Sequence, residues 1–147
     1  NCPLIVQAMI KDDKVRVIEL SARTGGGSKH HLIKFMTGID VIQLFIDDCE
    51  KKHKPIEPVL LDRKLAMQYV YAEPCVFGHI EGLEELKEEK KIIDYYIYKT
   101  KGMEVKNASN SSDRCCGFLV DAGEIQDVID DFDILDISGR KVKKVWN

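Results

Sequence analysis

The chain has 147 residues, 44% of them hydrophobic and 32% charged, which is ordinary for a globular domain that buries a core. Its formal net charge of -3 argues against a nucleic-acid-binding protein, because such a protein normally presents a basic face. No apolar run approaches the roughly 20 residues of a membrane-spanning helix. The five cysteines lack the spacing of zinc ligands or of a disulfide framework, so we expect a cytoplasmic protein with reduced thiols.

The first predicted element is a β-hairpin. Residues 4–10 and 15–20 are apolar, β-prone runs, and the polar residues 11–14 between them favour a turn. If the chain turns around Asp13, residues equidistant from it pair across the hairpin, which places Gln7 opposite Glu19.

Two helices are predicted next. Residues 29–37 carry apolar side chains at helical spacing, and Gly38 is suited to end that helix. Asp40 is suited to cap the following helix, for which we expect a buried apolar stripe. The residues of this stripe are Val41, Leu44, Phe45 and Cys49.

The remainder of the sequence is dominated by predicted strands. They are expected at residues 65–71, 92–98, 103–105 and 116–122. Residues 124–132 are predicted to form a helix, and Ser138-Gly139 is predicted to join a last hairpin of residues 134–137 and 141–145. Gly78 and Gly82 are interpreted as turn residues.

These elements define the expected fold class and domain organisation. The mixture of a hairpin, helices and further strands predicts an α+β protein with antiparallel sheets. The character of the sequence changes after Pro58. We therefore expect residues 1–58 to form one domain and residues 59–147 to form a β-rich lobe with one helix.

Polar side chains follow one face of the second predicted strand. Alternate residues of an extended strand share a face, so Glu19, Ser21 and Arg23 are expected to project together, with Gln7 beside them on the first strand. Amide, carboxylate and hydroxyl oxygens are ligands that suit a hard cation such as Mg2+. A guanidinium next to them suits the oxygens of a phosphate or an acyl phosphate.

A glycine-rich turn follows this strand. Gly25, Gly26 and Gly27 are expected chiefly to allow positive φ where the strand turns into a helix, and a second interpretation is ligand binding through their backbone amides. Their order differs from that of a phosphate-binding P-loop. His30 and His31 are adjacent on the predicted helix, so their rings are expected to diverge.

In this order, the elements resemble the end of an ATP-grasp domain. The matching residues are Gln7, the run Glu19-Leu20-Ser21-Ala22-Arg23, the glycines 25–27 and the run Thr37-Gly38-Ile39-Asp40. The resemblance implies that Gln7 and Glu19 bind metal ions that bridge the phosphates of ATP, and that Arg23 contacts the acyl phosphate or the terminal phosphate. Ser21 stands where the family usually has an asparagine ligand. Because serine is shorter, direct ligation, ligation through water and no ligation all stay open.

The rest of the chain is similar in layout to the small β-rich lobe that follows the ATP-grasp core in amino-acid ligases, and the glutamine at position 7 is similar to the carbamoyl-phosphate synthase large subunit. Nothing in the sequence corresponds to the lysines and the glycine-rich loop with which the preceding part of such enzymes holds ATP. The chain thus resembles a C-terminal fragment of an ATP-grasp ligase.

The resemblance implies a function and partners. We expect a fragment of an ATP-dependent carboxylate–amine ligase that forms an acyl phosphate with ATP and Mg2+, or Mn2+, and that is inactive alone. Its partner would be the missing N-terminal ATP-grasp portion or a complementary subunit, its substrates a small carboxylate and an amine, and a homodimer is a further expectation. The alternative is a non-catalytic binding or oligomerisation module derived from an ATP-grasp protein.

Overall fold

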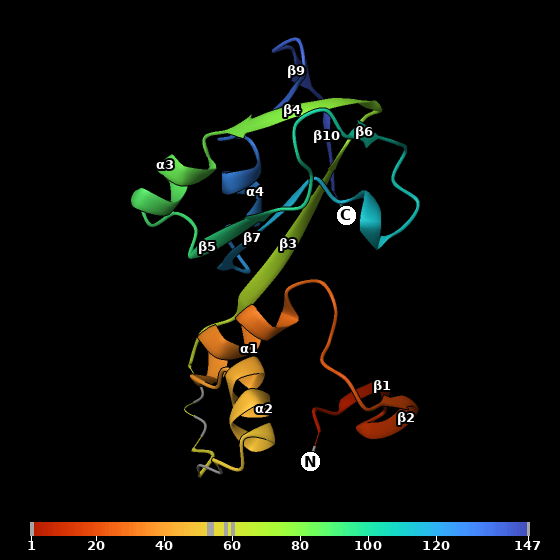
Figure 1. Ribbon diagram of the computed structural model, residues 1–147, viewed down its shortest axis with the longest axis vertical. Helices are drawn as coiled ribbons and strands as arrows, with labels where there is room; N and C mark the ends of the chain where they lie inside the picture. The colour runs from red at the N-terminus through yellow and green to blue at the C-terminus, as the bar shows by residue number, and fades with distance from the viewer. Residues whose placement is uncertain (1, 53–54, 58, 60, 147) are drawn as a thin grey trace. The chain divides into compact units, whose positions relative to one another are not determined.

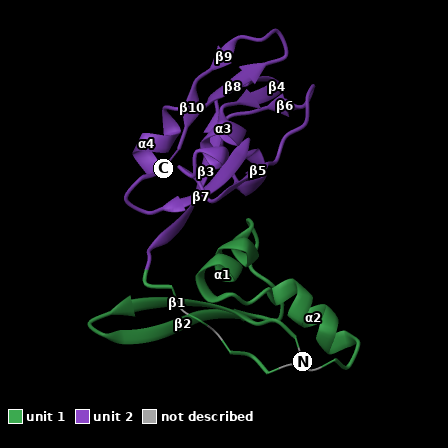
Figure 2. Ribbon diagram, turned by 90° about the vertical axis from the view of Figure 1, so that its left-hand side faces the viewer, with its two compact units in different colours: residues 1–62 green, residues 63–147 purple. Residues whose placement is uncertain are grey.

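A computed structural model describes residues 2–52, 55–57, 59 and 61–146. The chain forms two compact units, unit 1 with residues Asn1–Asp62 and unit 2 with residues Arg63–Asn147 (Figure 2). The change of character expected at Pro58 lies outside the described residues. Among the described residues, no helix has the length and apolarity to cross a bilayer.

Unit 1 contains a hairpin and two helices (Figure 1). The elements are strands β1 (Ile5–Lys11) and β2 (Lys14–Ser21) and helices α1 (Lys29–Thr37) and α2 (Val41–Cys49). Helix α1 ends at Gly38, which adopts a left-handed conformation with φ 73°. Asp40 caps α2 by accepting hydrogen bonds from the backbone N–H groups of Ile42 and Gln43. The predicted range of the first helix, its end at Gly38 and the predicted cap of the second helix at Asp40 agree with the structure.

The expected buried stripe of α2 is wrong. No apolar residue of this helix is buried, Phe45 is 41% exposed, and Cys49 is exposed. The buried residue of α2 is instead Asp47, which accepts a hydrogen bond of 2.9 Å from the side-chain amide of Gln43. The apolar side chains are at helical spacing, as the sequence indicates, but Val41 and Leu44 are only half-buried and Phe45 is exposed.

Unit 2 is built on two four-stranded antiparallel sheets. One has the strand order β10-β3-β7-β5 and the other the order β6-β4-β8-β9. The strands are β3 (Leu65–Ala72), β4 (Cys75–Glu81), β5 (Asp94–Ile97), β6 (Glu104–Val105), β7 (Cys116–Asp121), β8 (Asp133–Asp136), β9 (Lys141–Val142) and β10 (Lys144–Val145). Two short helices, α3 (Leu83–Glu88) and α4 (Ile125–Ile129), and a 3-10 turn, η1 (Ser111–Asp113), complete this unit.

The core of the protein lies in unit 2. Phe77, Phe118 and Phe132 are at most 2% exposed, and the rings of Phe118 and Phe132 meet edge to face with their centroids 6.0 Å apart. Helices α3 and α4 contribute buried side chains such as Leu86 and Ile129. These helices are short, so their stability depends on this packing rather than on their own hydrogen bonds.

Strand β4 and helix α3 were not predicted. The strand contains Gly78, which in sequence reads as a turn residue. In the structure, β4 pairs with β8 through an irregular register at Phe77–His79. A Cβ atom on Gly78 would lie 2.2 Å from the backbone oxygen of Asp136, so only glycine permits this close approach of two strands.

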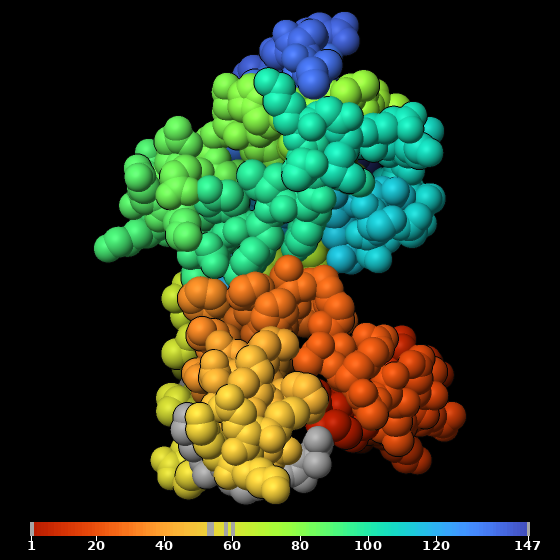
Figure 3. Space-filling view, in the orientation of Figure 1, coloured from red at the N-terminus to blue at the C-terminus, as the bar shows by residue number. Residues whose placement is uncertain are grey.

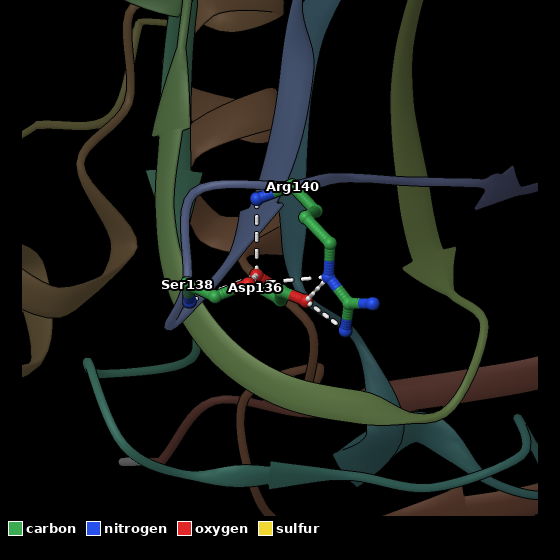
Figure 4. A network of polar contacts seen from close by, with 3 residues as sticks. All are labelled: Asp136, Ser138 and Arg140. Carbon is green, nitrogen blue, oxygen red and sulfur yellow. Dashed lines mark hydrogen bonds and ion pairs between the residues drawn. The ribbon is translucent and has the colours of Figure 1, made fainter.

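The last predicted hairpin is confirmed for its turn and its first pair of strands. Strand β8 pairs with β9, but the chain then leaves this sheet and β10 pairs with β3 in the other one. The side chain of Asp136, 8% exposed, closes the turn by accepting hydrogen bonds from the Ser138 hydroxyl and from the backbone N–H groups of Ser138 and Arg140 (Figure 4). The Arg140 guanidinium also pairs with it. These bonds, the Ser138 hydroxyl first, hold the pKa of Asp136 well below its ordinary value.

The five cysteines differ in burial between the two units. Cys2 and Cys49 of unit 1 are exposed, whereas Cys115 and Cys116 of unit 2 are fully buried. Burial raises the pKa of Cys115 to about 11 and raises that of Cys116 further. All are free thiols, as expected from their spacing.

The close approach of β8 to Gly78 predicts that a side chain at this position lowers the free energy of unfolding. We expect Gly78→Ala to destabilise unit 2 by about 2 kcal/mol or more, because backbone atoms of β8 must move to admit a methyl group. The matched control is Gly123→Ala, since a Cβ atom at Gly123 meets nothing within 4 Å, and its effect should stay within about 0.5 kcal/mol. Urea denaturation of both variants measures the difference, and equal losses of stability would contradict the close approach.

Candidate functional site

The hairpin of unit 1 is closed by two residues of unusual backbone conformation. Strands β1 and β2 pair from Lys11 and Lys14 outward, which leaves Asp12 and Asp13 as the loop. Both have positive φ, 51° and 56°, as a two-residue type I′ turn requires. Aspartate tolerates this region better than most residues. The turn sets a register in which residue numbers of paired positions sum to 25.

A β-bulge changes this register along the hairpin. Ala8 pairs with Val17, but the next residue of β1, Gln7, pairs with Glu19, so Ile18 is the extra residue of β2. Without the bulge, Gln7 would face Ile18 and Glu19 would fall on the other face. The predicted pairing of Gln7 with Glu19 is therefore present, through a bulge that the prediction did not include. Its signal in the sequence is Val17-Ile18, two adjacent apolar residues in an otherwise alternating strand.

The bulge keeps the two faces of the hairpin chemically distinct. Cross-strand partners share a face, so Gln7, Glu19 and Ser21 lie on one side together with Arg16. The opposite side, here called the apolar face, consists of Val6, Ala8, Ile10, Val15, Val17 and Leu20. Its large side chains are between 51% and 77% exposed. A contiguous apolar surface of this kind is typical of a surface that packs against another element.

Arg23 does not continue the line of Glu19 and Ser21. Strand β2 ends at Ser21, and the backbone N–H of Arg23 donates a hydrogen bond of 2.9 Å to the Ser21 carbonyl, which bends the chain. The guanidinium Nη1 donates to the carbonyl of Thr24 at 3.1 Å. The expectation that Glu19, Ser21 and Arg23 project from one extended strand is thus corrected, because the strand ends before Arg23.

The three glycines play different parts in the turn before α1. Gly27 has φ 67°, as expected for a strand-to-helix turn, and Ser28 follows with φ 60°. At Gly25, an added Cβ atom would lie 3.1 Å from Lys29 Cδ and 3.4 Å from Ile5 Cδ1, so a side chain there would require these neighbours to shift slightly. At Gly26 an added Cβ atom would meet nothing within 4 Å. The expected positive φ is therefore found at Gly27 alone of the three.

A cavity of about 650 Å³ lies beside this turn, within unit 1. Ile5, Arg23 and Gly25 line it on the hairpin side, and Ile33, Leu44 and Phe45 line it on the helix side. In the space-filling view the N-terminal residues, in dark red, lie recessed between the hairpin and α2 (Figure 3). The walls are mainly apolar, which suits a molecule with an apolar body. The charged lining residues are of both signs: Arg23, Lys29, Lys52, Asp47 and Asp48. The apolar residues of α2 thus line a hollow rather than a core.

Two histidines stand at the start of α1. His30 lines the cavity, and its ring centroid lies 4.0 Å from that of His31. The expectation that the two rings diverge is wrong, because the rings of these neighbours in sequence are in contact.

The oxygens on the polar face of the hairpin fit a cation whose other ligands come from a bound phosphate. Gln7 and Glu19 lie opposite each other, are exposed, and offer one amide and one carboxylate oxygen group. The described residues contain no group of three or more His, Cys, Asp or Glu side chains that could hold a metal ion by themselves. This donor set suits Mg2+, which commonly binds one or two protein oxygens together with phosphates and water.

Comparisons with known proteins identify the fold. No family model and no curated protein matches the sequence. The crystal structure of phosphoribosylglycinamide synthetase from Anaerococcus prevotii matches 92% of this chain with a TM-score of 0.76 and 18% identity. The crystal structure of L-amino acid ligase from Bacillus licheniformis matches 92% of it with a TM-score of 0.68 and 22% identity. The chain covers 37% and 36% of those two proteins, little more than a third of each.

These likenesses concern the fold. Both proteins are ATP-grasp ligases, and the chain has the α+β fold of the corresponding part of such enzymes. The expected resemblance to an ATP-grasp fragment is confirmed at this level.

The bulge can be tested by removing its extra residue. Deletion of Ile18 should leave a regular ladder in which Gln7 still pairs with Glu19, because the bulge is the sole irregularity in this register. Nuclear Overhauser effects between residues 7 and 19 measure the pairing in the unchanged protein and in the deletion variant. Contacts of Gln7 with Leu20 in the variant, or with Ile18 in the unchanged protein, contradict the register.

Proposed function

We propose that this chain is a fragment of an ATP-dependent carboxylate–amine ligase. In the complete enzyme, ATP would phosphorylate a small carboxylate, and an amine would attack the resulting acyl phosphate. The chain would supply residues that bind the cation and the transferring phosphoryl group, in the cytoplasm. The observation that carries this proposal is the pairing of Gln7 with Glu19 on one face of the hairpin, in a chain with an ATP-grasp fold.

Gln7 and Glu19 would hold Mg2+, or Mn2+, against the phosphates of ATP. The cation would neutralise charge on the phosphates during transfer, a step in which positioning and electrostatics supply most of the catalysis. Ser21 is partly buried and pairs with Ile5 at the end of the ladder. It lies on the same face as Glu19, so we propose it as the weaker ligand, acting through water because its side chain is short.

Arg23 and the glycine turn would bind the acyl phosphate. Arg23 and Gly25 both line the cavity, so a carboxylate bound beside them would meet the guanidinium while its apolar part occupies the hollow. The backbone amides of Gly25, Gly26 and Gly27 precede the N-terminus of α1, where a helix dipole favours negative charge.

The partner of the hairpin would be the N-terminal portion of an ATP-grasp domain, on the same polypeptide or on a separate subunit. A two-stranded hairpin is marginally stable by itself in water, and its apolar face needs a cover. The two similar ligases are nearly three times longer than the part that this chain matches. The chain alone would therefore lack both the cover of the apolar face and the nucleotide pocket, and would be inactive.

The apolar face also favours the second candidate function, a non-catalytic module. In that case the same surface would mediate association, for example of two copies of the chain, and Glu19 would have no role in turnover. A substitution of Glu19 distinguishes the two functions. It should impair turnover in a ligase, but it should not affect association through the apolar face, because Glu19 lies on the opposite side of the hairpin.

The catalytic role of Glu19 is tested by Glu19→Gln in the complete enzyme. We expect ATP turnover to fall by about 100-fold to 1000-fold, because one charged ligand of the cation is lost while the shape is kept. The matched control is Arg16→Gln on the same face of the hairpin, nearer the turn, which should leave turnover within about twofold. Release of ADP measures the rate, and an unchanged rate in Glu19→Gln would favour the non-catalytic module.

Nucleotide binding by the chain alone is a separate prediction. Titration calorimetry of the 147-residue chain with ATP and Mg2+ should show a dissociation constant no tighter than about 1 mM, because a few oxygen ligands and one arginine form only part of a site. Tight binding of ATP by the isolated chain would falsify the proposal that the nucleotide pocket lies elsewhere.

A further inference from the structure

The outer face of one sheet of unit 2 gathers tyrosines around a glycine. Tyr69 of β3 and Tyr96 of β5 both pair with Gly117 of β7, so they flank it on the same face of the sheet. The ring of Tyr98 lies 6.4 Å from that of Tyr69, centroid to centroid. We call Tyr69, Tyr96 and Tyr98 the tyrosine face. The opposite face of the same strands, with Val70 and Phe118, belongs to the core.

Gly117 lets the tyrosine face pack closely onto the sheet. A Cβ atom at Gly117 would lie 3.1 Å from Cδ1 of Tyr69, so the ring of Tyr69 rests in the space that a side chain would take. The ring of Tyr69 thus packs against the backbone of β7 and presents its other face to a neighbouring side chain.

Arg114 lies on the ring of Tyr69. Its guanidinium carbon is 3.8 Å from the centroid of the Tyr69 ring, within the range of a stacked cation–π contact. The Nε atom of Arg114 is buried and has no hydrogen-bond partner. Among the described residues, no carboxylate pairs with this guanidinium. A buried, unsatisfied donor is rare in folded proteins and calls for a physical explanation.

The neighbouring acid does not neutralise Arg114. Asp113 accepts hydrogen bonds from the backbone N–H groups of Ser109 and Asn110, at 2.8 and 3.0 Å, and from the Ser109 hydroxyl at 3.1 Å. These bonds, with the backbone bond from Ser109 the largest, lower the pKa of Asp113. They bind its carboxylate into the loop that ends in η1. Among the described residues, the arginine that follows it in sequence has no carboxylate partner.

A second cation reaches this loop from the connection between β5 and β6. The ammonium of Lys99 donates a hydrogen bond of 3.0 Å to the carbonyl of Ser112, two residues before Arg114. Lys99 follows Tyr98 of the tyrosine face, and one of its three donors is used by this bond. Two cations and several aromatic rings thus gather at one end of the sheet, with the local carboxylate already satisfied.

We propose that Arg114, stacked on Tyr69, binds an oxyanion, a carboxylate or a phosphate group of a ligand, at the outer face of unit 2. Stacking occupies one face of the guanidinium and leaves its two terminal nitrogens, Nη1 and Nη2, for a bidentate contact. A role limited to packing would need only the planar body of the side chain, whereas the terminal nitrogens have no hydrogen-bond partner among the described residues and stay available to a ligand. The site lies in unit 2, so it does not depend on the function proposed for the hairpin.

The test is a titration of the 147-residue chain followed by nuclear magnetic resonance. Sodium phosphate and sodium acetate are added separately at constant ionic strength, with chloride as the exchanged anion. The side-chain Nε–Hε signal of Arg114 is expected to shift along a saturating curve with one of the two anions, and the tighter one identifies the ligand group as phosphate or carboxylate.

Matched variants separate binding from general charge effects. Arg114→Gln should weaken the apparent affinity at least tenfold, and Arg114→Lys should weaken it about fivefold, because lysine keeps the charge but loses the fork of donors. Arg16→Gln removes an equal charge from the hairpin and should leave the affinity unchanged. Backbone spectra of the lysine variant verify that unit 2 stays folded. A linear shift without saturation, no shift at all, or equal affinities in Arg114→Lys and Arg16→Gln would overturn the proposal.

Discussion

The accommodation of Ile18 as one extra residue in β2 is the constraint on which the candidate site depends. The I′ turn at Asp12 and Asp13 sets one register, and the bulge changes it before the strands reach Gln7 and Glu19. Because the side-chain period of a strand is two, a change by one residue exchanges the faces. The bulge thus brings an amide and a carboxylate together and returns Leu20 to the apolar face.

This arrangement places an apolar association surface and a polar ligand-binding surface on opposite faces of the same two strands. The same ladder that presents oxygens on one face presents a row of exposed apolar side chains on the other. The apolar surface, which needs a cover for the hairpin to be stable, lies directly behind the surface that we propose to bind a cation. Covering the apolar face would therefore order the polar one, so association and ligand binding would stabilise each other.

Local signals in the sequence were sufficient for many elements and insufficient for others. The end of α1 at Gly38 and the start of α2 at Asp40 were predictable, because helix capping and left-handed helix termination depend only on the residue and its sequence neighbours. Strand β4 could not be predicted in the same way. Glycine is required at position 78 because the backbone at Asp136, about 58 residues later in the chain, passes close to it. For the site, the pairing of Gln7 with Glu19 was predicted from spacing, whereas the bend at Arg23 depends on a hydrogen bond between backbone groups that leaves no pattern in the sequence.

The unequal burial of the cysteines divides the chain by chemical reactivity. Thiolates are the species that react with maleimides and oxidants, and burial holds Cys115 and Cys116 in the protonated form at neutral pH. Cys2 and Cys49, both exposed, belong to the unit that carries the cavity and the hairpin. A thiol-reactive fluorophore or spin label would therefore attach first to unit 1 of the natural sequence and report on ligands there, while the core of unit 2 stays unmodified.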